Sequence, residues 1–206
     1  MTTISMTADE TRAVYRDDMT LREARQRYFE RNGFDDTTYV ESWVKLPFGP
    51  FHIYMPNFPA RKEAVKVHDL NHLVGGYGTD WRGEFEISAF EIGMGTGRYW
   101  FGWFLDVGGL AGGLLLSPTT TLSAFARGRR AKSSVYRHVD VWDEAFLDTT
   151  VGALRANLAL DDAPVATAAE KRAAFAWAAV GLLLHGVLPL LAFVAVVAGV
   201  VAVVGG

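Results

Sequence analysis

The 206-residue sequence contains no cysteine. It can therefore form no disulfide framework, no zinc ribbon and no thiolate nucleophile. A transition-metal site in this chain has to be built from histidine, aspartate and glutamate, and only five histidines are present. The positions of those histidines consequently carry more information than they would in a histidine-rich protein.

Charge is missing from the C-terminal part of the chain. The 34 residues from Ala173 to Gly206 include no Asp, Glu, Lys or Arg, so every charged side chain lies in the first 172 positions. A membrane span needs about 20 apolar residues, and a straight helix of this length would reach about 51 Å across a hydrocarbon core of about 30 Å. Composition therefore predicts a membrane-bound segment at 173–206.

Pro189 lies near the middle of this apolar segment and removes the hydrogen bond to the carbonyl of His185. Three forms fit: one tilted and kinked span, a re-entrant hairpin, or two short helices. An interruption near His185 to Pro189 is the favoured expectation, and His185 either has a function or satisfies freed backbone. Lys171 and Arg172 precede the segment, so the positive-inside rule places the preceding domain in the cytoplasm.

The composition of the rest of the chain argues against two further classes, nucleic-acid-binding proteins and secreted proteins. The net charge is −3, with basic residues dispersed apart from one cluster, which does not predict nucleic-acid binding. The first residues are polar and acidic without an apolar core, so no secretory signal is expected there. We expect a flexible leader at 1–19, a helical domain at 20–163, a linker at 164–172 and the membrane segment at 173–206.

Capping and turn signals predict a mainly α domain. Thr20 and Glu23 form a capping box before a helix that Gly33 can end. Four prolines within residues 47–59 predict a loop there, with at most a short strand. Further helices are expected from Ala60 to Gly75, from Asp80 as cap through Met94, from Pro118 with Ser117 as cap, and across 141–160.

The helix expected after Ala60 carries a metal-ligand pattern. His68 and His72 are four residues apart and project from one helix face, and Asp69 shares the same arc. A Gly-Gly turn would bring Glu84, on the next helix, back across from the histidines. Two imidazoles with one or two carboxylates form a nitrogen and oxygen set for a divalent metal, with zinc as first choice and iron or manganese as alternatives.

Glu91 follows Glu84 by seven residues, so both share one helix face. It is the candidate catalytic residue, either orienting a ligand imidazole or accepting a proton, and the alternative is a solvated glutamate. The pattern is not that of zincins, because Asp69 occupies the place of their general-base glutamate. A phosphohydrolase set would need ligands such as His138 and Asp140, and their spacing does not argue for it.

The segment from Tyr99 to Leu116 is rich in glycine and aromatic residues, with Asp106 as its one charge in mid-run. Small residues let an isoprenoid chain approach the backbone, and aromatic rings supply contact area, so the segment could line a lipid groove. Ordinary core packing explains the same composition equally well.

The order His68-Asp69-Leu70-Asn71-His72, eleven residues and Glu84 resembles the HDxxH-x11-E signature of the fourth coenzyme Q (ubiquinone) biosynthesis protein family. Phe90-Glu91, the run from Gly128 to Ala131, Tyr136, Trp142 and Leu154-Arg155 resemble further elements of that family, over about residues 20–163. The Gly-rich segment and the apolar tail depart from it.

The resemblance implies a mostly helical fold with a metal held at His68, Asp69, His72 and Glu84. It also implies a channel for a prenylated quinone precursor, an oxidative decarboxylation or hydroxylation of its ring, and contacts with other quinone-biosynthesis proteins. Two other functions remain as alternatives: a non-catalytic lipid-binding scaffold with a structural metal, and a metal-dependent hydrolase.

Overall fold

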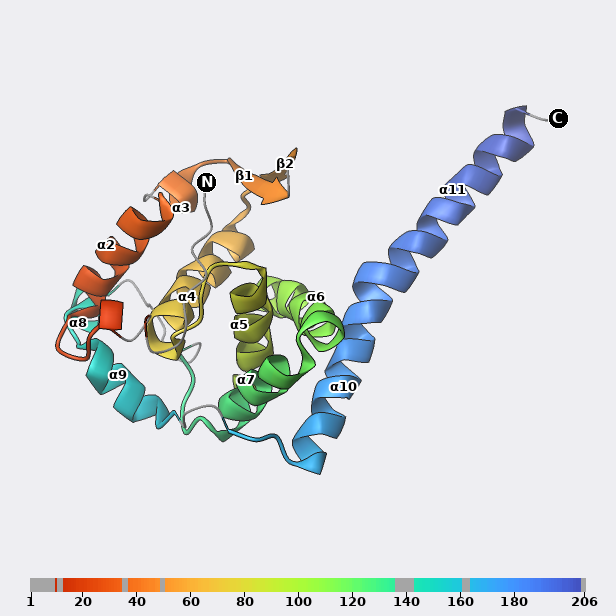
Figure 1. The fold of residues 1–206 in the computed structure, drawn as a ribbon. Helices are drawn as coiled ribbons and strands as arrows, with labels where there is room; N and C mark the ends of the chain where they lie inside the picture. The colour runs from red at the N-terminus through yellow and green to blue at the C-terminus, as the bar shows by residue number, and fades with distance from the viewer. Residues whose placement is uncertain are drawn as a thin grey trace.

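The protein is mainly helical, as the sequence predicts. The computed structural model describes residues 10, 13–34, 37–48, 51–135, 143–160 and 164–204. Its helices gather into one cluster, from which the C-terminal helix projects as a long rod (Figure 1). The elements, in chain order, are α2 (Leu21–Asn32), α3 (Thr37–Val40), β1 (Trp43–Phe48), β2 (Phe51–Pro56), α4 (Pro59–Gly75), α5 (Trp81–Met94), α6 (Trp100–Leu116), α7 (Pro118–Arg130), α8 (Glu144–Leu147), α9 (Val151–Leu158), α10 (Ala168–Leu182), a π-helical turn (Leu183–Val187) and α11 (Leu188–Val204).

The local signals that begin and end the first helices are confirmed. Thr20 and Glu23 form the capping box of α2, and Gly33 ends that helix in the left-handed conformation. Gly76 ends α4 in the same way, with its N–H donating to the carbonyl of His72. Asp80 caps α5 by accepting from the Gly83 N–H at 2.8 Å. These caps fix the short turn that sends α5 back along α4.

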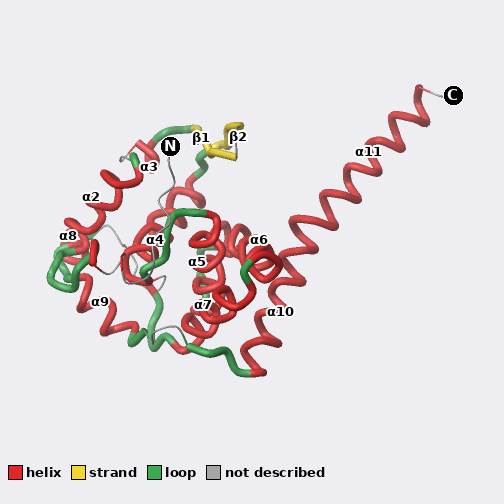
Figure 2. Tube along the Cα trace, in the orientation of Figure 1, coloured by secondary structure: helices red, strands yellow, loops and turns green. Residues whose placement is uncertain are grey.

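The proline-rich segment is more ordered than the sequence predicts. β1 and β2 form a two-stranded antiparallel ribbon, with Val44 opposite Met55, and they are the strands drawn in yellow in Figure 2. Pro47 and Pro56 both lie in this ribbon. In a two-stranded ribbon each strand keeps one edge without a ladder partner, so a residue that cannot donate a backbone hydrogen bond is tolerated there.

Residues 13–19, which the sequence assigns to a flexible leader, belong to the domain. Tyr15 and Met19 are buried in the core beside α2, α4 and α9. The Arg155 guanidinium donates to the Tyr15 carbonyl at 3.0 Å and to Asp17 at 2.6 Å. The leader expectation over 1–9 and 11–12 lies outside the described residues.

The helix expected across 141–160 is divided in two. α8 ends at Leu147, and Thr150 starts α9 by accepting from the Ala153 N–H at 3.1 Å. Ser117 likewise stands before Pro118 at the start of α7, but its hydroxyl makes no capping hydrogen bond. Position alone therefore predicted the start of α7 correctly and the role of the Ser117 hydroxyl wrongly.

The glycine-rich segment forms helix α6, and its glycines serve packing. A Cβ added at Gly109 would lie 2.2 Å from the Ser88 Oγ, and one at Gly112 would lie 3.1 Å from the Phe85 ring. The small residues thus let α6 approach α5 closely, which offsets the low helix propensity of glycine. The core-packing alternative is confirmed at these positions.

Helices α5 and α7 cross even more closely, at Gly93 and Gly128. A Cβ at Gly128 would lie 2.1 Å from the Phe90 carbonyl oxygen, and a Cβ at Gly93 would lie 2.3 Å from that of Phe125. Because both neighbours are backbone atoms, a side-chain rotation cannot relieve the overlap. This crossing fixes α5, which carries Glu84 and Glu91, against the core.

We expect Gly128→Ala to lower the free energy of unfolding by about 1–3 kcal/mol, because the helices must move apart to admit the methyl group. For a chain of this size each kcal/mol corresponds to a fall of about 2–4 °C in Tm. Thermal unfolding in detergent measures the effect. The matched control is Gly199→Ala in α11, where an added Cβ meets no atom within 4 Å, and equal Tm values for the two variants would contradict the packing described.

The apolar tail is one continuous helix rather than a hairpin or two separate helices. It begins at Ala168, within the expected linker, under a capping box formed by Thr167 and Glu170. The turn from Leu183 to Val187 is π-helical, and the Leu188 N–H donates to the carbonyl of Leu183. This wider turn lies directly before Pro189 and lets the helix continue past it, since local π adjustments re-satisfy backbone groups near a proline.

The first half of this rod packs on the domain and the second half does not. Trp177 contacts Trp103 of α6 edge to face at 6.1 Å, and the His185 Nε2 lies 2.7 Å from the Phe104 carbonyl oxygen. His185 therefore contacts a backbone carbonyl of α6, rather than the backbone freed beside Pro189 that the sequence suggested as its partner. The side chains from Leu188 to Val201 are exposed. The helix Ala168–Val201 is long and apolar enough to span a membrane.

Candidate metal centre

The centre lies where α4, α5 and α6 converge. His68 and His72 project from one face of α4, with their rings perpendicular and 4.7 Å apart. The end of α4 is held by two arginines: Arg155 donates to the carbonyl oxygens of Leu73 and Val74, and Arg127 donates to that of Gly75. The histidines thus stand on a helix whose end is fixed by the rest of the domain.

Three ligand atoms from this unit meet at one point. The Nε2 atoms of His68 and His72 are 3.2 Å apart, and the Glu84 carboxylate lies 3.3 Å from the first and 3.5 Å from the second. Ligands of a tetrahedral zinc, about 2.05 Å from the ion, lie about 3.3 Å apart. The separations therefore equal the edges of a zinc coordination tetrahedron, and the group of His68, His72 and Glu84 could hold a metal ion.

The hydrogen-bond partners of the two imidazoles decide which nitrogen is free. The His72 Nδ1 faces the Tyr77 carbonyl oxygen at 3.2 Å, and the His68 Nδ1 faces a Glu91 carboxylate oxygen at 3.1 Å. Both partners accept, so in the neutral tautomers both Nδ1 atoms carry the proton and both Nε2 atoms present lone pairs. Two lone pairs and a carboxylate that point at one another repel unless a cation lies between them. A metal-binding histidine usually donates its other ring N–H to a carboxylate or a backbone carbonyl, as both histidines do here.

Asp69, expected as a fourth ligand from the family resemblance, is engaged elsewhere. Its carboxylate accepts from the Tyr28 hydroxyl at 3.3 Å and from the Tyr39 hydroxyl through a short hydrogen bond. It belongs to neither metal-binding group that the described residues form. Burial, opposed by the Tyr39 hydrogen bond, raises the pKa of Asp69 to about 6. The structure therefore places Asp69 beside the centre, with its oxygens held by two tyrosines.

Glu91, expected as the catalytic residue, is completely buried behind His68. One of its oxygens accepts from the His68 Nδ1 and the other from the Asn71 Nδ2, at 2.6 Å. A carboxylate in this place orients the imidazole and increases its basicity as a ligand. Of the two roles considered from the sequence, the contact with His68 fits the orienting role.

Asp106 of α6 is the site residue that sequence reasoning missed. It is 3 % exposed, and with His68 and Glu91 it forms a second group that could hold a metal ion. The sequence offers one signal for it, a lone carboxylate in an otherwise uncharged run of 17 residues. A charge in such a run is costly to bury without a partner, so its presence indicates a polar neighbour in the core.

The carboxylates around His68 stabilise a positive charge at this position, whether a proton on the imidazole or a metal ion. Burial lowers the pKa of His68, but Glu91 and Glu84 outweigh that effect and raise the pKa well above its usual value. At His72 burial outweighs the attraction of Glu84, and the pKa is lowered. A metal must displace the His68 proton, so its affinity increases with pH until that proton is lost.

The centre is open on one side. The side chain of His72 is 1 % exposed, whereas those of His68 and Glu84 are 23 % and 43 % exposed. Three protein ligands with an accessible side leave a coordination position for water or substrate, which is the arrangement of catalytic rather than structural zinc sites.

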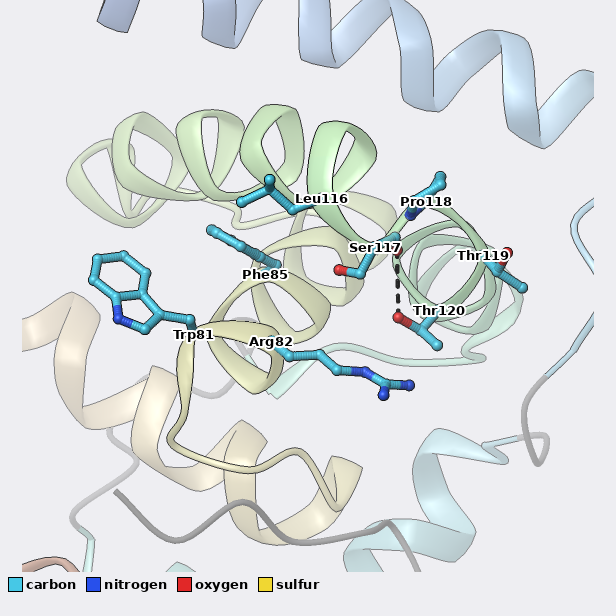
Figure 3. Close-up of a pocket in the computed structure, with 8 residues that line it drawn as sticks. All are labelled: Trp81, Arg82, Phe85, Leu116, Ser117, Pro118, Thr119 and Thr120. Atoms are coloured by element: carbon cyan, nitrogen blue, oxygen red, sulfur yellow. Dashed lines mark hydrogen bonds between the residues drawn. The ribbon is translucent and has the colours of Figure 1, made fainter. Parts of the chain in front are cut away.

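A surface cavity of about 520 Å³ lies on the neighbouring face of α5, where this helix meets the junction of α6 and α7 (Figure 3). Trp81, Phe85 and Leu116 form apolar walls, and Arg82, Ser117 and Thr120 add polar groups. None of these residues belongs to the metal-binding groups, although Phe85 directly follows Glu84. The cavity therefore lies next to the centre along the chain, but the two share no residue.

Comparisons with known proteins do not assign the chain to a family. No protein-family model, no curated protein and no solved structure matches the chain. The expected alternative ligands His138 and Asp140 lie outside the described residues, as do Tyr136 and Trp142 of the family resemblance. The case for function therefore depends on the centre and on the C-terminal helix.

Proposed function

We propose that this chain is a membrane-anchored protein that binds a divalent metal at His68, His72 and Glu84. The convergence of two imidazole Nε2 atoms and one carboxylate at separations of 3.2–3.5 Å carries the proposal. Glu91 orients His68, and the Tyr77 carbonyl orients His72. Zinc suits this donor set and spacing best, and iron or manganese accept the same ligands.

The membrane location rests on the C-terminal helix. Its last part is exposed on the isolated chain, and its residues are apolar throughout, so a bilayer is the environment that this surface fits. Lys171 and Arg172 lie in the first turns of α10, on the domain side of the apolar run. The positive-inside rule then gives a domain that faces the cytoplasm.

The substrate proposed for the centre is a prenylated quinone precursor or a related isoprenoid lipid. The HDxxH-x11-E order supports this class by resemblance, and the anchor would hold the centre where such lipids dissolve. A metal held there would supply Lewis-acid polarisation of a ring carboxylate for decarboxylation, in which carbon dioxide leaves and a proton takes its place. A hydroxylation or oxidative decarboxylation would need dioxygen and a two-electron reductant as co-reactants. This chain's residues would hold that metal, orient its ligands and leave the side of Glu84 open to the ring.

The two alternative functions make different demands on the coordination position of the metal that the protein leaves free. A scaffold with a structural metal needs a closed set of ligands, and a hydrolase needs an open position with a base near the bound water. The exposure of Glu84 argues against a closed site. Glu91 lies behind His68 rather than at the open side, so it is not placed to activate water for hydrolysis.

Mass spectrometry of lipid extracted from the purified full chain tests the substrate class. We expect a polyprenylated aromatic precursor to be enriched over a membrane protein of similar size purified from the same host in the same detergent. Glu84→Gln should reduce that enrichment, because the ring is proposed to contact the metal. A lipid profile identical to that of the comparison protein would contradict the proposed substrate and leave the metal centre untouched.

A further inference from the structure

The face of His68 opposite the metal centre carries a second set of ligand atoms. His68, Glu91 and Asp106 each offer one ligand atom, and these atoms lie within 4.8 Å of one another. His68 stands between the two groups, with Nε2 toward Glu84 and Nδ1 toward Glu91. The second group draws on three helices, α4, α5 and α6, so it is built by the packing of the domain.

Two buried oxygen atoms near Glu91 lack a partner. Asp106 is 3 % exposed, and its Oδ2 accepts no hydrogen bond. Asn71 is completely buried and donates to Glu91, yet its own Oδ1 has no donor. Buried acceptors almost always have a hydrogen-bond or ion partner. Two unpartnered acceptors near one carboxylate therefore indicate a binding position for a cation or a hydrogen-bond donor.

Charge leads to the same conclusion. Asp69, Glu84, Glu91 and Asp106 bring four carboxyl groups to the surroundings of two histidines. Among the described residues, the ion pairs of Glu84 and Glu91 are with histidine alone, and Asp106 has no ion pair with lysine or arginine. A divalent ion at the second position would balance Glu91 and Asp106, whose carboxyl groups otherwise share a hydrogen bond. Buried charges require this kind of compensation.

We propose that Glu91 and Asp106 hold a second divalent cation beside the first, so that the centre is dinuclear with the His68 imidazole bridging its two positions. Binding of the second cation then releases to solvent the Nδ1 proton that His68 otherwise donates to Glu91. The Asp106 Oδ2 and the Asn71 Oδ1 are buried oxygen atoms that accept no hydrogen bond, and both residues contact Glu91. Oxygen-rich ligands favour a hard ion such as Mn²⁺ or Mg²⁺. The inference rests on the metal centre proposed above and extends it from one ion to two.

Manganese alone is the probe. The full chain in detergent is depleted of metal, titrated with Mn²⁺ and freed of excess ion. Metal analysis should then find two manganese ions per chain, one for each group, and electron paramagnetic resonance should show magnetic coupling between them. Asp106→Asn should lower the content to one ion per chain and leave an uncoupled signal, because it removes an anionic ligand while keeping the side-chain shape.

Glu86→Gln is the matched control, since Glu86 lies on α5 but outside both groups and pairs with Arg82. It should keep two ions and the coupled signal. Glu91→Gln gives a second test of the same position if Asp106→Asn does not fold. Wild-type chain that takes up a single ion, unchanged by Asp106→Asn, would overturn this inference while the first site remains. Chain that takes up no ion would overturn both sites.

Discussion

Glu84→Gln in the full chain should raise the dissociation constant for zinc at the first site at least about 100-fold. The substitution keeps the size of the side chain but replaces the anionic ligand that lies 3.3 Å from the His68 Nε2 and 3.5 Å from the His72 Nε2. Loss of a residue that merely orients a ligand costs about 10–100-fold in affinity, so the loss of a ligand costs at least as much. Competition with a zinc chelator of known affinity measures the change.

Glu86→Gln, two residues away on α5, is the control for this measurement. Glu86 accepts from Arg82 at 2.8 Å and contacts neither histidine. An exposed pair of this spacing contributes about 0.3–0.5 kcal/mol to stability, so the control should fold and should bind zinc as the wild type does. Equal zinc affinity in the Glu84 and Glu86 variants would exclude Glu84 from the site.

The second large effect is expected in the C-terminal helix. Replacing both Val194 and Val197 with arginine should remove the chain from the membrane fraction, because an arginine near the centre of a span costs about 2.5–3.5 kcal/mol for insertion. Both positions lie in α11, after the rod has left the domain, and both side chains are exposed. Sedimentation of membranes after carbonate washing measures the partition of the chain.

Val165→Arg is the control, since Val165 precedes the helix and is 85 % exposed outside the apolar run. That variant should remain with the membranes. If the Val194 and Val197 double variant also stays in the washed membrane fraction, α11 is not the anchor. Retained zinc binding in the released double variant would show that the soluble domain holds the metal by itself.

Sequence patterns predicted the parts of the fold that depend on local chemistry. The capping box at Thr20, the glycine that ends α4 and the Asp80 cap of α5 each involve residues a few positions apart. The placement of Glu84 opposite the histidines follows from the same local signals, because a short turn between capped helices makes them antiparallel. Local order thus accounts for the three atoms of the first site.

Features that depend on distant parts of the chain were not predictable in this way. Asp69 shares a helix arc with the histidines, but the tyrosines that hold it lie 30 and 41 residues away in the chain. Asp106 reaches Glu91 only because glycines let α6 pack closely on α5, as at Gly109 against Ser88. These carboxylates lie far apart in the sequence, and tertiary packing decides which of them joins the candidate metal-binding group and which is held by other residues.

The continuous C-terminal helix illustrates a different limit. The pattern around Pro189 predicts an interruption, because proline removes one hydrogen bond from a regular helix. The chain keeps its direction by widening the preceding turn from Leu183 to Val187 into a π-helical one. His185 within that turn is fixed by its contact with the Phe104 carbonyl of α6. Whether a proline breaks a helix or is absorbed depends on such contacts.

X-ray absorption spectroscopy of the zinc-loaded full chain, with zinc below one equivalent, tests the central claim most directly. The geometry predicts two imidazole ligands, from His68 and His72, with oxygen atoms completing a shell at about 2.0–2.1 Å. Imidazole rings give a distinct scattering pattern beyond the first shell, and Glu84→Gln should weaken the bound signal. A spectrum of oxygen neighbours alone, without imidazole scattering, would contradict the metal centre described for α4 and α5.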